Sequence, residues 1–367
     1  MTEVQEAPSV REPRTVRLVD ADIHPAPPQP AVLSRLPERW RRHVERFGRR
    51  MPLITELYPR ASNGGMRVDS WPETPGGFPG SDLGLLQRQV LDEYDLDYGV
   101  LNCLSLLDCH EVPELTAALA RAINDWMAEE LLDRDPRLLG SIVVPYEYAE
   151  LSVQEIERCA GDERWVQVLM PGTAFEPLGS RKYWPIYEAA TAHGLPVAVH
   201  NAGYEPHLAT GWPSYYLEEH VAYSFVMQSQ LLNMVCEGLF AAVPGLRLVL
   251  TEGGVAWVTA LRWQLDSAWE LLRDEVPALE RPPSEYVRDH VWFTTQPIEE
   301  PEDPADFARA LEFAELGDRL LFATDYPHWD FDSPTQALPR SLPDEVRAAV
   351  FGGNAAALYR LPLESRT

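Results

Sequence analysis

Eight short apolar runs, separated by segments of helical pattern, constrain the fold of this chain more than any other feature. The runs cover residues 16–23, 98–104, 138–145, 165–170, 196–200, 247–252, 291–295 and 319–324. Between them, apolar side chains recur three and four positions apart, as in amphipathic helices, over residues 115–132, 184–192, 220–240 and 255–272. Alternating strands and helices predict a parallel α/β fold, and eight strands favour a closed (β/α)8 TIM barrel over an open sheet.

The same alternation predicts the domain organisation. Residues 1–15 are expected to be a disordered tail, and residues 16–367 a single barrel domain. Long segments follow the first and fifth strands, at residues 25–80 and 201–216. Such excursions usually form lids and substrate walls on the active face of a barrel, although an oligomer contact is an alternative.

The charge of the chain limits its partners. Its 57 acidic and 31 basic residues give a formal net charge of −26, which repels nucleic-acid phosphates and anionic membrane surfaces. We find no apolar run long enough to span a bilayer and no signal-peptide pattern at the N-terminus. The sequence therefore predicts a cytoplasmic protein that acts on a small molecule, with no nucleic-acid or membrane partner.

Cysteine and lysine give few candidates for covalent chemistry. No C-x-x-C pair occurs, so reduced thiols are expected at Cys103, Cys109, Cys159 and Cys236. Cys109 could be a nucleophile beside His110, but adjacent residues on a strand point to opposite faces. Lys182 is the only lysine. A carboxylated lysine bridging two metals therefore has no candidate in the fourth strand, and a Schiff base would have to form on Lys182 in a polar segment.

Four of the apolar runs end in side chains that can bind a metal: Asp22 and His24, then His200, Glu252 and Asp325. In a barrel of parallel strands these ends lie on one face, where catalytic groups gather. Asp22 and His24 point the same way because they are two residues apart. Asp20 shares that face, but its Cα lies about 13 Å from that of His24, so it is expected to anchor the strand below.

Each of these residues also has a simpler explanation. The Asp-x-His pattern is common, and a histidine that ends a strand often bonds a backbone carbonyl. Asp325 is harder to explain, because a carboxylate at the end of Leu320-Leu-Phe-Ala323 needs a partner. Together, the spacing and the strand-end positions predict a metal-dependent active site.

Three motifs resemble those of a known family. They are Val19-Asp-Ala-Asp-Ile-His-Pro25, Ala323-Thr-Asp-Tyr-Pro-His328 and Phe351-Gly-Gly-Asn-Ala-Ala-Ala-Leu-Tyr-Arg-Leu361, the last like a C-terminal helix. The chain resembles the amidohydrolase superfamily, in the branch of aminocarboxymuconate-semialdehyde decarboxylase and gamma-resorcylate decarboxylase. The resemblance implies a homodimer with one divalent metal ion held by Asp22, His24, His200 and Asp325. The decarboxylases end their sixth strand in a histidine, whereas this chain has Glu252 there.

The glutamate directs the first functional hypothesis. Asp22, Asp325 and Glu252 around one ion leave the site anionic, which disfavours a carboxylate substrate unless Glu252 is protonated or Arg67 compensates. We therefore expect metal-assisted hydrolysis, with Asp325 as acid/base and Glu252 as a second acid/base. The alternative is non-oxidative decarboxylation of an aromatic or enol acid, in which Asp325 protonates the carbon that loses CO₂. A barrel that only binds is disfavoured, because all four metal positions are present.

The oxygen-rich ligand set favours Mn²⁺ or Mg²⁺, and two histidines keep Zn²⁺ open.

Aromatic residues on segments expected at the barrel mouth predict a planar or aromatic substrate. They are Trp71, Phe78, Tyr204, Trp212, Tyr215, Tyr216, Trp329 and Phe331. The alternative is that many of them pack the long loops together. Arg67 is expected to grip an anionic group or to form a surface salt bridge, and His328 to orient Asp325 or the substrate. His207 and His220 could be lid residues without a chemical role.

Overall fold

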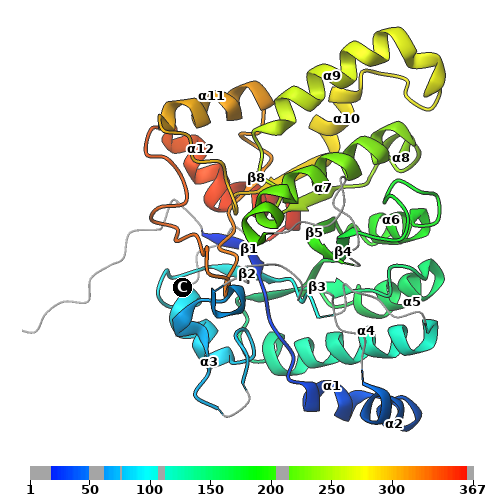
Figure 1. Cartoon of the computed structure of the whole chain (residues 1–367), viewed down its shortest axis with the longest axis vertical. Helices are drawn as coiled ribbons and strands as arrows, with labels where there is room; N and C mark the ends of the chain where they lie inside the picture. Colours follow the sequence, from blue (N-terminus) through cyan, green and yellow to red (C-terminus); the bar gives the residue numbers. More distant parts are fainter. Residues whose placement is uncertain (1–17, 49–61, 75–76, 106–111, 204–214, 362–367) are drawn as a thin grey trace, which may run out of the picture.

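The computed structural model describes residues 18–48, 62–74, 77–105, 112–203 and 215–361. Its eight parallel strands follow one another in sequence order around a barrel, with helices between them (Figure 1). The strands are β1 Val19–Ile23, β2 Tyr98–Leu101, β3 Leu138–Val143, β4 Trp165–Thr173, β5 Val197–Gly203, β6 Leu248–Thr251, β7 Val291–Thr294 and β8 Leu320–Leu321. The predicted (β/α)8 architecture is confirmed.

Backbone hydrogen bonds between the first and last strand segments bring the two edges of the sheet together. The Ala21 amide donates to the Phe322 carbonyl at 2.8 Å, and the His24 amide to the Tyr326 carbonyl at 2.8 Å. The Asp325 amide donates to the Asp22 carbonyl at 3.1 Å. Closure of the barrel therefore places the first and last candidate metal ligands on neighbouring strands.

Several strands end at other residues than the apolar runs predict. β2 ends at Leu101 instead of residue 104, and β8 contains only Leu320 and Leu321. In the other direction, β4 and β5 continue past their apolar runs until Thr173 pairs with Gly203. Hydrophobicity marks the buried part of a strand, whereas its end depends on whether the neighbouring backbone continues to pair.

The helices are α1 Gln29–Arg35, α2 Glu38–Phe47, α3 Leu83–Leu86, α4 Pro113–Met127, α5 Ala149–Cys159, α6 Trp184–Ala192, α7 Tyr216–Cys236, α8 Leu239–Ala242, α9 Trp257–Leu272, α10 Pro283–His290, α11 Pro304–Ala314, α12 Asp344–Ala348 and α13 Asn354–Tyr359. The single helix predicted for residues 220–240 is wrong. Gly238, at φ +75°, separates α7 from α8, because glycine adopts the left-handed region that ends a helix. The long segment 25–80 holds α1 and α2, and α1 packs on α4 (Figure 1).

Two apolar clusters form the core, and the smaller one includes residues of the strands and of α13. In this smaller cluster, Val100, Leu139 and Ala198 lie two residues before Asn102, Ser141 and His200. Because strand side chains alternate, each pair shares one face. The strand face that is apolar in this cluster therefore becomes polar toward the strand ends.

No helix within the described ranges is long and apolar enough to cross a membrane. The predicted tail at residues 1–15 lies outside those ranges.

Candidate metal centre

The strand ends bring the predicted metal ligands together in the barrel. Asp22 lies in β1 with His24 just after it, and His200 lies in β5. Asp325 follows β8, and its Oδ1 lies 2.7 Å from His24 Nε2, although the two residues are 301 positions apart. All four side chains are buried. The parallel barrel thus makes one cluster from both ends and the middle of the chain.

Close contacts join the four residues. Asp22 Oδ1 lies 3.3 Å from His24 Nε2, and Asp22 Oδ2 lies 3.3 Å from His200 Nε2. Ligand atoms of Asp22, His24 and His200 lie within 4.8 Å of one another. A second group with the same spacing consists of His24, Asp325 and His328. His24 belongs to both groups, so it links Asp22 and His200 on one side with Asp325 on the other.

The hydrogen bonds of the cluster fit a cation. The Nδ1–H of His24 donates to the Asn102 carbonyl at 2.9 Å, so the ring turns Nε2 toward two carboxylates. In a neutral ring this Nε2 carries a lone pair, which the carboxylates repel unless a proton or metal lies between them. Asp325 Oδ2 is buried and has no hydrogen-bond partner among the described residues. This set of carboxylates and imidazoles suits Mn²⁺, Mg²⁺ or Zn²⁺.

Burial and the charges within the cluster shift the pKa values of its carboxyl groups in different directions. Burial opposes ionisation of Asp22, but His24 and His200 outweigh it and hold the pKa of Asp22 below its ordinary value. Burial likewise opposes ionisation of Asp325, and His328 and His24 lower its pKa. Burial raises the pKa of Glu252 well above its ordinary value, and the negative charges of Asp325 and Asp22 add to this effect. The surroundings therefore favour ionisation of Asp22 and Asp325 and disfavour ionisation of Glu252.

Glu252 and Asp325 both have left-handed backbones. Their φ angles are +63° and +60°, and such conformations cost non-glycine residues about 1–3 kcal/mol each. Glu252 Oε2 lies 3.5 Å from His200 Nδ1. Left-handed residues that point polar side chains at one cluster are typical of functional sites.

Asp20 lies below the cluster and links β1 to the segment after β8. Its carboxylate accepts hydrogen bonds from the Thr324 amide at 3.0 Å, the Thr324 hydroxyl at 2.5 Å and the Asp22 amide at 3.0 Å. This is the anchoring role that the sequence predicts for Asp20.

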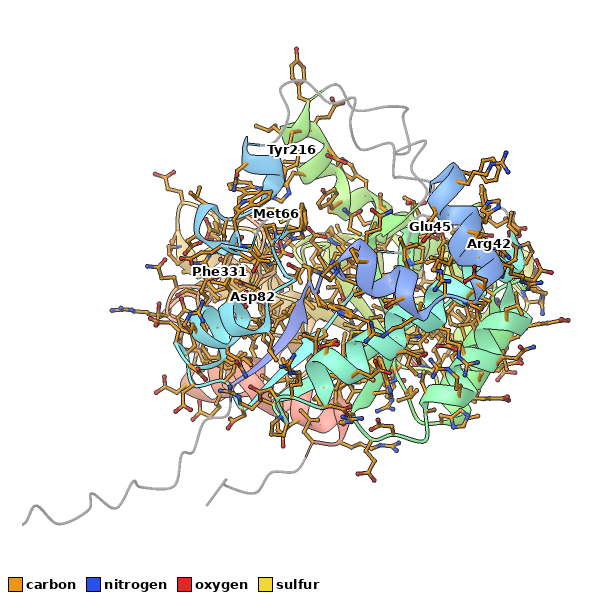
Figure 2. The ribbon with its side chains drawn as sticks, turned by 90° about the horizontal axis from the view of Figure 1, so that it is seen from below. Arg42, Glu45, Met66, Asp82, Tyr216 and Phe331 are labelled. Carbon is orange, nitrogen blue, oxygen red and sulfur yellow. The ribbon has the colours of Figure 1, made fainter. Side chains whose placement is uncertain are left out.

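The rim of the site joins the segment after β8 to α7. Trp329 Nε1 donates to the Tyr216 hydroxyl at 2.8 Å, and His220 Nε2 lies 3.3 Å from Asp330 Oδ2. On the other side, the Trp329 amide donates to the Gly65 carbonyl at 2.9 Å. In Figure 2, the labelled Met66 and Phe331 lie below Tyr216 on the same side of the molecule. His220 therefore has an acidic partner. Trp329, in the segment after β8, contacts α7 through Tyr216 and the segment around Gly65 through its backbone.

The remaining predicted residues vary in their surroundings. Arg67 binds Asp69 at 2.8 Å and stacks over Phe331 at 4.4 Å, so it forms the salt bridge considered above. Trp71 packs against Phe78 with ring centroids 5.5 Å apart, and Tyr215 is exposed. Lys182 pairs with Glu147. The predictions for Cys109, Tyr204, His207 and Trp212 fall outside the described residues.

Sequence reasoning missed Asn102, which bonds two of the proposed ligands. Its Nδ2 donates to Asp22 Oδ1 at 2.7 Å, and its carbonyl accepts from His24. Asn102 follows β2 directly, so the strand-end rule that selected His24 and Asp325 would also have selected it.

Gly80 offers a test of how closely His24 is positioned. At φ +82°, a Cβ on Gly80 would lie 2.2 Å from the His24 carbonyl oxygen, whereas one on Gly48, at φ +78°, meets nothing within 4 Å. We expect Gly80→Ala to weaken metal binding about 10-fold or more, because His24 must move. Gly48→Ala should cost only the backbone penalty of about 1–3 kcal/mol, because Gly48, at ψ −177°, lies in a region that is essentially restricted to glycine. Metal titration and thermal unfolding of both variants check this, and equal behaviour would contradict it.

Comparison with known proteins gives a family match over most of the chain. The profile of the family described as Amidohydrolase matches residues 19–361. A gamma-resorcylate decarboxylase of Polaromonas sp. (strain JS666) is 25% identical over an alignment of 308 residues that covers 79% of this chain and 91% of that protein. A gamma-resorcylate decarboxylase of Rhizobium radiobacter is 24% identical over an alignment of 319 residues that covers 79% of this chain and 94% of that protein.

Solved structures share the fold. The 5-carboxyvanillate decarboxylase of Sphingomonas paucimobilis superposes with a TM-score of 0.67 at 21% identity, covering 95% of this chain and 100% of that chain. A second structure is a dihydroxybenzoic acid decarboxylase of Polaromonas sp. JS666 with bound manganese and the inhibitor 2-nitroresorcinol. It superposes with a TM-score of 0.64 at 19% identity, covering 95% of this chain and 98% of that chain.

Proposed function

Because this chain belongs to the amidohydrolase family, we propose that it is a metal-dependent, non-oxidative decarboxylase of a small aromatic or enol carboxylic acid. The observation that carries the proposal is the buried cluster of Asp22, His24, His200 and Asp325 at the strand ends. The curated decarboxylases that the chain resembles over 79% of its length support it.

This proposal reverses the order of the two hypotheses drawn from the sequence. The comparisons favour decarboxylation over the hydrolysis that Glu252 suggested. The repulsion of a carboxylate substrate was expected from the charges of Asp22, Asp325 and Glu252 alone. A divalent cation would offset Asp22 and Asp325, so a carboxylate substrate need not meet a repulsive site.

Asp22, His24, His200 and Asp325 are the proposed ligands of one ion. Manganese is our first candidate, since carboxylate oxygens with imidazole nitrogens suit it and the structurally similar dihydroxybenzoic acid decarboxylase contains it. A bound divalent ion would act as a Lewis acid and withdraw electron density from oxygen atoms of the substrate.

The side chains of this site can carry out the proton transfer. In the reaction, the bond between the ring and the carboxylate carbon breaks, CO₂ leaves, and the ring carbon gains a proton. We assign delivery of that proton to Asp325, which first has to take it up because its pKa is held below the ordinary value. His328 Nδ1 lies 2.6 Å from Asp325 Oδ1, and its side chain is 21% exposed, so it connects Asp325 to the rim and can resupply the proton. Glu252, beside His200, is the second acid/base.

The substrate pocket is proposed to include aromatic residues of the rim. Trp329 and Tyr215 lie where α7 meets the segment after β8, and Trp71 lies on the loop that follows β1. Tyr204 and Trp212 are further candidates from the sequence. Arg67 would bind an anionic group only after its contact with Asp69 is exchanged, since that carboxylate now occupies two of its nitrogens.

Hydrolysis remains the second candidate, because Glu252 stands where the resemblance to the decarboxylases implies a histidine, and it lies next to His200. A carboxylate there can take a proton from an attacking water.

One assay separates the two candidates. Protein loaded with manganese is incubated with 2,6-dihydroxybenzoate, 5-carboxyvanillate and related hydroxybenzoates, and in parallel with a panel of esters, lactones and amides. We expect CO₂ release from at least one acid, and none from protein treated with a chelator. Turnover of the ester, lactone or amide panel without CO₂ release would contradict decarboxylation and support hydrolysis.

We also propose that the enzyme is a cytoplasmic homodimer. Leu217, Val221 and Phe225 lie four residues apart on α7 and are 75%, 61% and 57% exposed. They form one apolar stripe on the helix surface, which is a feature of protein interfaces.

A further inference from the structure

A buried chain of hydrogen bonds connects the C-terminal helix α13 to the metal centre. The Tyr359 hydroxyl donates to Gln167 Oε1 at 2.8 Å. Gln167 Nε2 donates to Asn102 Oδ1 at 3.0 Å, and Asn102 Nδ2 donates to Asp22 Oδ1 at 2.7 Å. Three links thus join the last helix of the barrel to a proposed metal ligand on the first strand.

Ser141 strengthens the middle of this chain. Its hydroxyl donates to Asn102 Oδ1 at 2.5 Å and accepts from Gln167 Nε2 at 2.9 Å. The oxygen of the Asn102 side chain therefore has two donors, so its NH₂ group must face β1. The Asn102 carbonyl also accepts from His24 Nδ1 at 2.9 Å. One asparagine thus orients two ligands, Asp22 with its side chain and His24 with its backbone.

Burial fixes the orientations of the Asn102 and Gln167 amides. Asn102, Ser141 and Gln167 are 0% exposed, and Tyr359 is 7% exposed. A reversed Asn102 amide would place its oxygen against the Asp22 carboxylate, and a reversed Gln167 amide would oppose its oxygen to Asn102 Oδ1. In a dry interior such contacts are costly, so each amide determines the orientation of the next. Burial also raises the pKa of Tyr359, which keeps its proton available for Gln167.

We infer that Asn102, Gln167 and Tyr359 are positioning residues that hold Asp22 and His24 in the geometry for metal binding, so that α13 influences metal affinity. This inference rests on the metal site of the proposed function. The Tyr359 end is the informative one, because Tyr359 is three hydrogen bonds away from Asp22. A second contact holds α13 in place, since Arg247 Nη1 donates to the Leu358 carbonyl at 2.6 Å.

Tyr359→Phe removes only the first donor of the chain, and Tyr187→Phe is its matched control. Tyr187 is a buried tyrosine whose hydroxyl donates to the Leu178 carbonyl at 2.8 Å, and none of its described hydrogen bonds leads to Asn102 or Asp22. Both variants lose one hydroxyl and one buried hydrogen bond. A purely structural effect should therefore lower the Tm of both.

The experiment measures the affinity for Co²⁺ and the visible absorption spectrum of the Co²⁺-loaded full-length protein. We expect Tyr359→Phe to raise the Kd about 10-fold, the lower end of the effect of outer-shell partners, and to change the absorption bands. Tyr187→Phe should keep the wild-type Kd and spectrum. If Tyr359→Phe also keeps both, the positioning role is wrong and the metal site stands. If the wild-type protein binds no Co²⁺, the metal site itself is contradicted.

Discussion

Replacing both His24 and His200 with alanine should remove the metal from this protein and reduce its activity to background. The two rings supply the nitrogen ligands of the proposed site, and each Nε2 faces the carboxylate of Asp22 at 3.3 Å. Without them, Asp22 and Asp325 remain as the ligands, and a pair of carboxylates holds a divalent ion only weakly in competition with water.

The double variant should also be less stable without metal. Asp22 is fully buried and would lose two imidazole partners. Removing one partner of a buried ion pair typically costs about 3–5 kcal/mol. Loss of metal therefore has to be distinguished from general loss of structure.

His290→Ala provides that distinction. His290 is 6% exposed, as is His24, and its Nδ1 donates to the Leu246 carbonyl at 2.8 Å. It stacks on Phe240 outside the cluster, so its removal leaves a cavity without touching a proposed ligand. Elemental analysis should find about one equivalent of metal in wild type and His290→Ala, and a small fraction in the double variant. Full metal content in the double variant would refute the assignment.

Asp325→Asn should lower kcat about 10²- to 10⁴-fold, the usual range for loss of a general acid or base. Asparagine has the size of aspartate and tolerates the left-handed φ of +60° at this position. Its oxygen can still accept a hydrogen bond from His328 Nδ1, which lies 2.6 Å from Asp325 Oδ1. The amide, however, cannot exchange a proton with the substrate, so we expect a large fall in kcat and only a small change in the stability of the fold.

A buried carboxylate elsewhere is the matched control for this variant. Asp135 is 5% exposed and pairs with Arg137 at 2.7 Å, in the turn before β3 at the opposite end of the strand. Asp135→Asn should lower the Tm and leave kcat unchanged. The measurement is kcat of each variant at saturating metal, with the metal Kd determined separately. Near-wild-type kcat for Asp325→Asn would reduce Asp325 to a metal ligand.

The sequence by itself determined the barrel and the strand-end positions of the proposed metal ligands. Eight apolar runs separated by helical periods leave few ways to bury all the strands, and a parallel arrangement places all strand ends on one face. Asp22, His24, His200 and Asp325 could be named for that reason, since each occupies the end of an apolar run. Their convergence follows from the topology without any knowledge of contacts.

Only the tertiary structure decided which side chains act on one another. Arg67 stacks on Phe331, and Asn102 connects Gln167 to Asp22, although these residues are far apart in the sequence. Gly238 divides a helix that hydrophobic periodicity had joined. Periodicity records which face of an element is buried. The partner of a polar side chain depends on the register of neighbouring strands and on loops between them, which form only when the barrel closes.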